Sequence, residues 1–185
     1  MSEVRWWGWG TLDVTYSLEN RPHFWPFVVA ALGLTGQEHG QVTPLESIAL
    51  RPCRLSDVAL DALRAALGDH TVPAQGDHTG SPLPAVSTAH ADRVRHACGK
   101  SYRDLVRLRR GEVPHPPDAV AYPDTQEGVM AVLRLAGEHG FSVAPFGGGS
   151  SVTGGVEPLG ERPSVTLDLR RLDKVLAVDA VSHTA

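Results

Sequence analysis

In the first half of the chain, apolar residues recur at the spacing of helices. Ser56 and Ser101 stand where helix N-caps are expected, and an aspartate three residues after Ser101 would lie near the positive end of the helix dipole. Gly33 and Gly68 each follow the last apolar position of a segment, where glycine commonly ends a helix. Together these signals predict helices over residues 25–32, 56–67 and 89–111.

The pattern changes beyond a proline-rich joint at residues 113–117. Ala119–Tyr122 predicts a first strand. Asp124 is placed to cap the helix that follows, and Glu127 would complete a capping box. The apolar stripe of this helix, which is predicted to cover the sheet, consists of Val129, Val132, Leu133 and Ala136.

A second strand, Phe141–Phe146, is a short apolar run and is predicted to be buried. Residues 165–169 and 175–181 predict two further strands. Parallel strands joined by a crossover helix form a right-handed unit. The fold class is therefore α+β: a helical N-terminal region at 1–112 precedes a strand–helix–strand unit within 113–185.

Residues 68–88 are predicted to form a loop, because prolines and glycines interrupt every regular pattern there. The pair Asp-His occurs twice in it, at Asp69-His70 and Asp77-His78. Zinc ligands usually come as close Cys/His pairs on ordered elements. A solvated loop is therefore expected, and no metal site is predicted.

The most distinctive segment follows the second strand and comprises Pro145, Phe146, Gly147, Gly148, Gly149, Ser150 and Ser151. Glycine lets the backbone take positive φ and approach a ligand closely. Successive N–H groups then point into one concavity that binds anions. Ligands bind at the carboxyl ends of parallel strands. The segment thus predicts a phosphate or pyrophosphate site, with a glycine-rich surface turn as the alternative.

This segment differs from two common phosphate-binding motifs. It lacks the Gly-Lys-Ser/Thr ending of an NTPase loop, so no lysine would reach a terminal phosphate. Val152 stands where the last glycine of a Gly-x-Gly-x-x-Gly motif would be. The sequence therefore predicts neither an NTPase nor a doubly wound dinucleotide fold.

A family resemblance emerges from the order of these segments. The run from Asp118 to Pro123, the glycine segment and the strand at 165–169 resemble the start of the flavin-binding domain of the vanillyl-alcohol-oxidase (PCMH-type) flavoproteins. Arg5–Gly10 and His96–Leu105 are similar to the branch that holds the alkyldihydroxyacetonephosphate synthases. The resemblance implies an N-terminal, truncated part of such a domain.

The resemblance also implies FAD, with its pyrophosphate on Pro145–Ser151. Some relatives bind the flavin covalently through a histidine in this loop. Gly149 occupies that place, so non-covalent FAD is expected. The family's catalytic tyrosine and histidine cluster lies in a C-terminal cap domain with no counterpart in this sequence, so no catalytic residue is predicted.

The function implied is that of a flavin-dependent alkyldihydroxyacetonephosphate synthase-like enzyme of ether-lipid synthesis. One alternative is an FAD-linked oxidoreductase of the glycolate or D-2-hydroxy-acid dehydrogenase type. Another is an inactive remnant. In a complete enzyme the substrate would be lipid-like or a hydroxy acid.

Composition narrows the class of partner. A net charge of −4 argues against nucleic acid, which favours a basic face. No run of 18 apolar residues predicts a membrane span. Two isolated cysteines, Cys53 and Cys98, are typical of reduced thiols, and a cytoplasmic location is expected.

Three features admit two interpretations each. The Trp-rich arm at 5–10 would either pack on its own chain or form a flap or subunit contact, so a homodimer stays open. His96 would be a buried structural histidine or would approach the ligand. The arginines that follow Ser101 would form a solvated helix face or approach an anion; they are Arg103, Arg107, Arg109 and Arg110.

Overall fold

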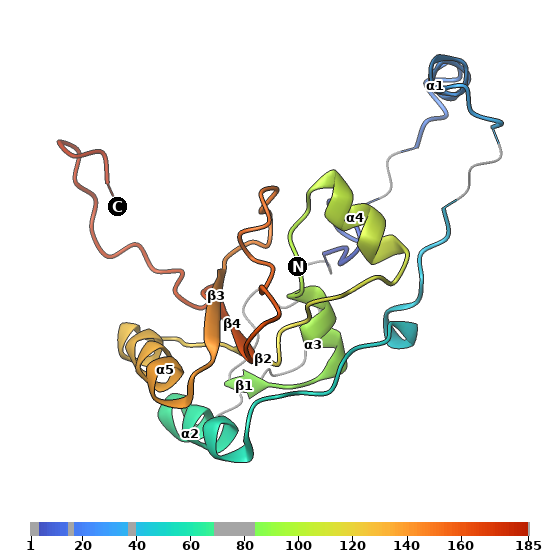
Figure 1. Ribbon diagram of the computed structural model, residues 1–185. Coiled ribbons are helices and arrows are strands. Elements are labelled where there is room, and N and C mark those ends of the chain that lie inside the picture. Colours follow the sequence, from blue (N-terminus) through green and yellow to red (C-terminus); the bar gives the residue numbers. More distant parts are fainter. Residues whose placement is uncertain (1–3, 15–16, 37–39, 69–83, 185) are drawn as a thin grey trace.

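The computed structural model describes residues 4–14, 17–36, 40–68 and 84–184. A helical N-terminal half precedes a strand–helix–strand unit, as the sequence predicted (Figure 1). One 3₁₀ turn lies at Leu45–Ser47. The helices are α1 Phe24–Leu32, α2 Asp57–Leu67, α3 His90–Arg95, α4 Tyr102–Arg109 and α5 Gln126–His139, and the strands are β1 Val86–Ser87, β2 Ala119–Ala121, β3 Ser142–Phe146 and β4 Ser164–Asp168.

The four strands form one sheet in the order β1-β2-β4-β3. β4 is parallel to both of its neighbours, and Thr166 is level with Val120 on one side and Ala144 on the other. β1 is antiparallel to β2. β2, α5 and β3 therefore form the predicted crossover unit, with β4 inserted between its two strands.

The two faces of the sheet differ in chemistry because side chains alternate along each strand. Val165 and Leu167 of β4 point into an apolar core shared with α2 and α5. Thr166 and Asp168 of the same strand are buried on the opposite face, which α3 covers. Figure 1 shows α2 and α5 on one side of the strands and α3 on the other. The sheet thus has an apolar face and a buried polar face.

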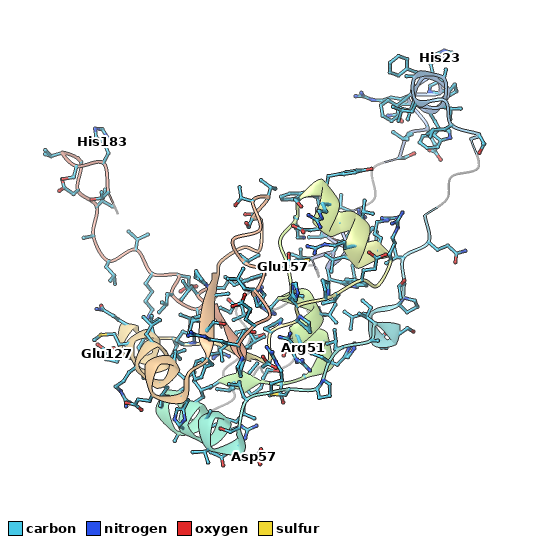
Figure 2. All side chains as sticks on the ribbon, in the orientation of Figure 1. His23, Arg51, Asp57, Glu127, Glu157 and His183 are labelled. Atoms are coloured by element: carbon cyan, nitrogen blue, oxygen red, sulfur yellow. The ribbon has the colours of Figure 1, made fainter. Side chains whose placement is uncertain are left out.

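Asp118, immediately before β2, joins three segments. Its carboxylate is fully buried and accepts hydrogen bonds from the backbone N–H groups of Arg54 and Ser164, both at 2.8 Å. The guanidinium groups of Arg54 and Arg51 lie 3.3 and 3.5 Å from the same carboxylate. Figure 2 labels Arg51 close to α3 and the strands. This carboxylate holds residues 51–54 against the amino ends of β2 and β4.

Several helix predictions are confirmed. Ser56 caps α2 through Ala59 N–H, and Ser101 caps α4 in a complete capping box. Gly33 ends α1 in the left-handed conformation. The predicted helix at 89–111 is instead two helices, because the chain bends between His96 and Ser101.

Two details of α5 were predicted wrongly. Thr125, not Asp124, is the N-cap, and its hydroxyl accepts the N–H of Gly128. Leu133 is 53% exposed, whereas Leu135 is buried. The side of α5 that packs on the core carries Val129, Val132, Leu135 and Ala136, and Leu133 lies outside this stripe.

Three strand predictions also need correction. β3 is the edge strand, and Ser142 and Pro145 are exposed, so the strand is not buried as predicted. Residues 175–181 pair with no strand among the described residues, and Leu176 is 91% exposed. The predicted loop at 68–88 contains β1, which forms because Val86 and Ser87 pair with β2. Residues 69–83, with both Asp-His pairs, lie outside the described residues.

The helix α1 stands apart from the sheet. None of its residues is buried, and Figure 2 shows its side chains spreading around it, away from the sheet. Among the described helices, none combines the length and apolar character that crossing a bilayer demands.

The Asp118 carboxylate yields a test of the fold. Replacing Asp118 with alanine should lower the free energy of unfolding by about 3 kcal/mol, because two backbone N–H groups and two guanidinium groups lose their acceptor. Asp61→Ala, which removes an exposed pair with Arg64 on α2, should change it by less than about 1 kcal/mol. Urea denaturation of both variants measures the difference. Equal effects would contradict the anchoring role.

Candidate functional site

The glycine segment lies at the carboxyl end of β3, level with the end of β4. Pro145 and Phe146 are the last two residues of β3, and Gly147–Ser150 then bend away. Gly149 has φ +66°, and a Cβ there would lie 2.5 Å from the Phe146 ring. Glycine is therefore required at 149, both for its backbone conformation and for its contact with Phe146.

The backbone amides of this segment are available to a ligand. Among the described residues, none accepts a hydrogen bond from the N–H groups of residues 147–151. Gly147, Gly148 and Ser150 are exposed, and a Cβ at Gly147 or Gly148 would meet no atom within 4 Å. Of the predicted site residues, Gly147–Ser151 thus form a run of N–H groups without an acceptor among the described residues, and the space beside Gly147 and Gly148 is open.

A second segment, Gly99-Lys100, fixes the end of this loop. The N–H of Lys100 donates to the carbonyl oxygen of Ser151 at 2.7 Å. A Cβ at Gly99 would lie 2.0 Å from the same oxygen, closer than any real contact. No neighbouring residue in the sequence marks Gly99 for this contact, because the contact joins residues 52 positions apart and only the fold brings them together.

Lys100 also holds the N-terminal arm. Its ammonium donates to the carbonyl oxygens of Arg5 and Gly8 at 2.9 and 2.6 Å and lies over the Trp9 ring at 5.7 Å. Burial lowers the pKa of this ammonium. Trp6 packs against Ile48 and its neighbours. The arm therefore packs on its own chain, the first of the two interpretations of the sequence.

A small pocket of about 90 Å³ lies between the arm, α3 and the glycine segment. Gly148, Gly149 and His96 line it. So do four basic residues, Arg5, Arg95, Lys100 and Arg170, together with the acidic Asp92. Its excess of cationic side chains suits an anionic group, and its volume admits only part of a cofactor.

His96 is one of the buried residues that line this pocket. It is 3% exposed, and its ring nitrogens lie 2.9 Å from Asp168 Oδ2 and 2.7 Å from the Asp92 carbonyl oxygen. The interpretation as a buried, hydrogen-bonded histidine is confirmed. Burial alone would raise the pKa of Asp168, but hydrogen bonds from His96 and Arg170 outweigh it and hold that pKa below its ordinary value.

A charged cluster fixes the chain that follows the glycine segment. Arg107 of α4 donates to Glu157 at 2.7 and 3.0 Å and to Asp104 at 2.6 Å. Figure 2 labels Glu157 below α4. The bonds to Glu157 raise the pKa of Arg107, and those from Arg107 and Ser101 lower the pKa of Asp104 despite its burial. The sequence left two interpretations of these arginines open, a solvated helix face or an approach to an anion. For Arg107 the solvated face does not hold, because its guanidinium is bonded to Glu157 and Asp104.

The remaining candidate groups carry no site of their own. Burial, reinforced by Asp104, raises the pKa of Cys98 to about 12, so this thiol stays neutral and weakly nucleophilic. Within residues 4–14, 17–36, 40–68 and 84–184, no three His, Cys, Asp or Glu side chains gather as metal ligands would.

Comparisons with known proteins agree with this geometry. Residues 117–185 match the family described as FAD binding domain. The alkyldihydroxyacetonephosphate synthase of Trypanosoma brucei brucei is 45% identical over 96 residues, which are 50% of this chain and 16% of the relative. That of Caenorhabditis elegans is 26% identical over 204 residues, 98% of this chain and 31% of the relative.

A solved structure of an alkyldihydroxyacetonephosphate synthase superposes with a TM-score of 0.71 at 28% identity, covering 97% of this chain and 34% of that one. The chain thus spans no more than about a third of the length of these relatives. Residues 117–185 therefore match the FAD binding domain family, and the chain as a whole is similar to part of the alkyldihydroxyacetonephosphate synthases.

Proposed function

We propose that this chain binds FAD non-covalently and that the backbone N–H groups of residues 147–151 hold its diphosphate. One observation carries the proposal: a row of amides without acceptors among the described residues, at the carboxyl end of the parallel strands β3 and β4. Hydrogen bonds to a charged acceptor contribute about 1.5–3 kcal/mol each. Micromolar affinity corresponds to about 8 kcal/mol, which three such bonds reach only near the upper end of that range and five reach near the lower end.

The residues present fit this group. Gly147 and Gly148 leave open the space that a Cβ would fill, so phosphate oxygens can approach the backbone. The basic residues around the adjoining pocket favour negative charge nearby. When bound, the flavin supplies redox or imine chemistry, while this chain binds and orients the nucleotide.

The non-covalent mode follows from position 149. Any side chain there would begin 2.5 Å from the Phe146 ring and with an unfavourable φ. A histidine able to attach a flavin therefore has no room at this place. Ser150 and Ser151 carry hydroxyl groups only, which lack a neighbouring base to activate them among the hydrogen bonds of the described residues.

We further propose that the chain serves a flavin-dependent alkyldihydroxyacetonephosphate synthase-like activity, the exchange of an acyl group for a long-chain alcohol in ether-lipid synthesis. The similarity to two synthases and to a synthase structure supports this. We assign no catalytic residue in this chain. A cytoplasmic location is also proposed, supported by two free cysteines.

Three glycine substitutions test the flavin site. Gly148→Ala should leave the free energy of unfolding nearly unchanged but weaken FAD about tenfold or more, because the methyl group enters the ligand's space. Gly99→Ala should weaken FAD at least as much, because it displaces Ser151. Flavin fluorescence titration measures both.

Gly137→Ala is the matched control, since it adds a methyl group to an exposed position of α5 that meets nothing within 4 Å. It should keep the FAD affinity and stabilise the helix by up to about 1 kcal/mol. If all three variants bound FAD equally, the glycine segment would not be the site.

The attachment mode has a direct readout. Acid precipitation of the FAD-loaded protein should release all of the flavin into the supernatant, because no side chain of the segment bonds to it. Absorbance of the supernatant and pellet measures the partition. Yellow flavin that stays in the washed pellet would contradict the proposal.

The wider activity is tested in the host. Disrupting the coding sequence should deplete alkyl-ether lipids measured by mass spectrometry, and restoring it should return them. Unchanged ether lipids with a lost oxidation of 2-hydroxy acids would instead support the dehydrogenase alternative.

A further inference from the structure

The two nitrogen atoms of the His96 ring both face oxygen acceptors. Nδ1 lies 2.7 Å from the carbonyl oxygen of Asp92, one turn earlier on α3. Nε2 lies 2.9 Å from Asp168 Oδ2 at the end of β4. A carbonyl oxygen can only accept. Nδ1 must therefore carry a proton.

The partner of Nε2 is a carboxylate that is already engaged as an acceptor. Arg170 donates to both oxygens of Asp168 through Nε, at 3.0 and 2.9 Å, and to Oδ2 through Nη2 at 2.5 Å. This geometry, together with the lowered pKa of Asp168, keeps the carboxylate ionised. A neutral His96 with its proton on Nδ1 would point a bare Nε2 at this anion.

The ring of His96 also supports the glycine segment. Its centroid is 4.5 Å from that of Phe146, with the planes tilted by 54°. Phe146 in turn lies directly against Gly149, where a Cβ would be 2.5 Å from its ring. A shift of the His96 ring is thus passed through one side chain to the loop that carries the amides.

We propose that His96 is a positioning residue, held as an imidazolium between Asp92 and Asp168, and that its charge fixes the glycine segment in the conformation that binds the anionic ligand. This rests on the proposed flavin site for the identity of the ligand, but the protonation and the positioning do not. Without that proton two acceptors would face each other, so loop order and affinity would fall.

The surroundings of His96 are defined on every side. Asp168 and the Asp92 carbonyl face its two ring nitrogens, and the Tyr122 ring contacts it edge-on at 5.9 Å between centroids. The side chain of Asp92 is held by the Ser87 hydroxyl. The other titratable groups lining the pocket are Arg5, Arg95, Cys98, Lys100 and Arg170. The carboxylate of Asp168 is the charged group within hydrogen-bond distance of the ring.

The protonation state is measured without any ligand. In protein labelled with ¹⁵N-histidine, the His96 ring, assigned by its absence in His96→Gln, should show two protonated nitrogens at neutral pH, because each nitrogen faces an acceptor. One protonated and one bare nitrogen at neutral pH would overturn the proposal.

Positioning is measured by backbone ¹⁵N order parameters of residues 147–151 in the free chain. His96→Gln should lower them from about 0.85 to below about 0.6, because the ring no longer supports Phe146. His90→Gln is the matched control, because it removes a bond from the same helix, to Ile48 O at 2.7 Å, away from the loop. Equal order parameters in wild type and His96→Gln would overturn the positioning role.

The link to the ligand is read from FAD affinity. Asp168→Asn, which removes the carboxylate that faces His96, should bind FAD about tenfold more weakly than the wild type, whereas His90→Gln should bind it equally. Equal affinities in the wild type and Asp168→Asn would count against the proposal. If wild-type protein bound no FAD, the flavin function would fail, and the order parameters and ring protonation would still decide the role of His96. If His96→Gln did not fold, Asp168→Asn and the wild-type spectrum decide it.

Discussion

The contact between Gly99 and the carbonyl oxygen of Ser151 is the constraint on which the candidate site depends. It allows the bend after α3 to reach the glycine segment, where Lys100 N–H bonds the same oxygen at 2.7 Å. The bond to this carbonyl fixes the loop at Ser151, and the packing of Phe146 against Gly149 fixes it where it leaves β3. Between these two points the amides have no competing acceptor among the described residues, which is the condition an anion site requires.

The sheet supports this arrangement because its buried apolar side chains lie on one face and its buried polar side chains on the other. Its apolar face packs on α2 and α5, where burial of side chains such as Leu63 and Val132 stabilises the fold. Its polar face carries Asp168 and Thr166 toward α3. Buried polar groups are costly unless paired, so the charged pairs on this face restrict the fold to one geometry near the pocket. The apolar core thus gives stability, and the polar face gives the site its orientation.

Local signals in the sequence predicted much of this fold. The caps at Ser56 and Ser101 and the stops at Gly33 and Gly68 depend only on neighbouring residues, and these helices appear where expected. The glycine segment also stands at the end of its strand as predicted. The pairing of Gly99 with Ser151, of His96 with Asp168 and of Arg107 with Glu157 could not be predicted, because each joins residues at least 50 positions apart. The strand expected at 175–181 shows the converse, since an alternating pattern forms a strand only where a partner is present.

Pro145 has a further consequence at the free edge of the sheet. Phe146 O accepts the N–H of Leu169, so the backbone polar groups of Phe146 face β4 and those of Pro145 face outward. A proline there removes one of the donors that an added strand would use. Edge strands with a full row of donors invite intermolecular pairing and fibril growth. The residue that begins the glycine segment therefore also discourages self-association along this side of the molecule.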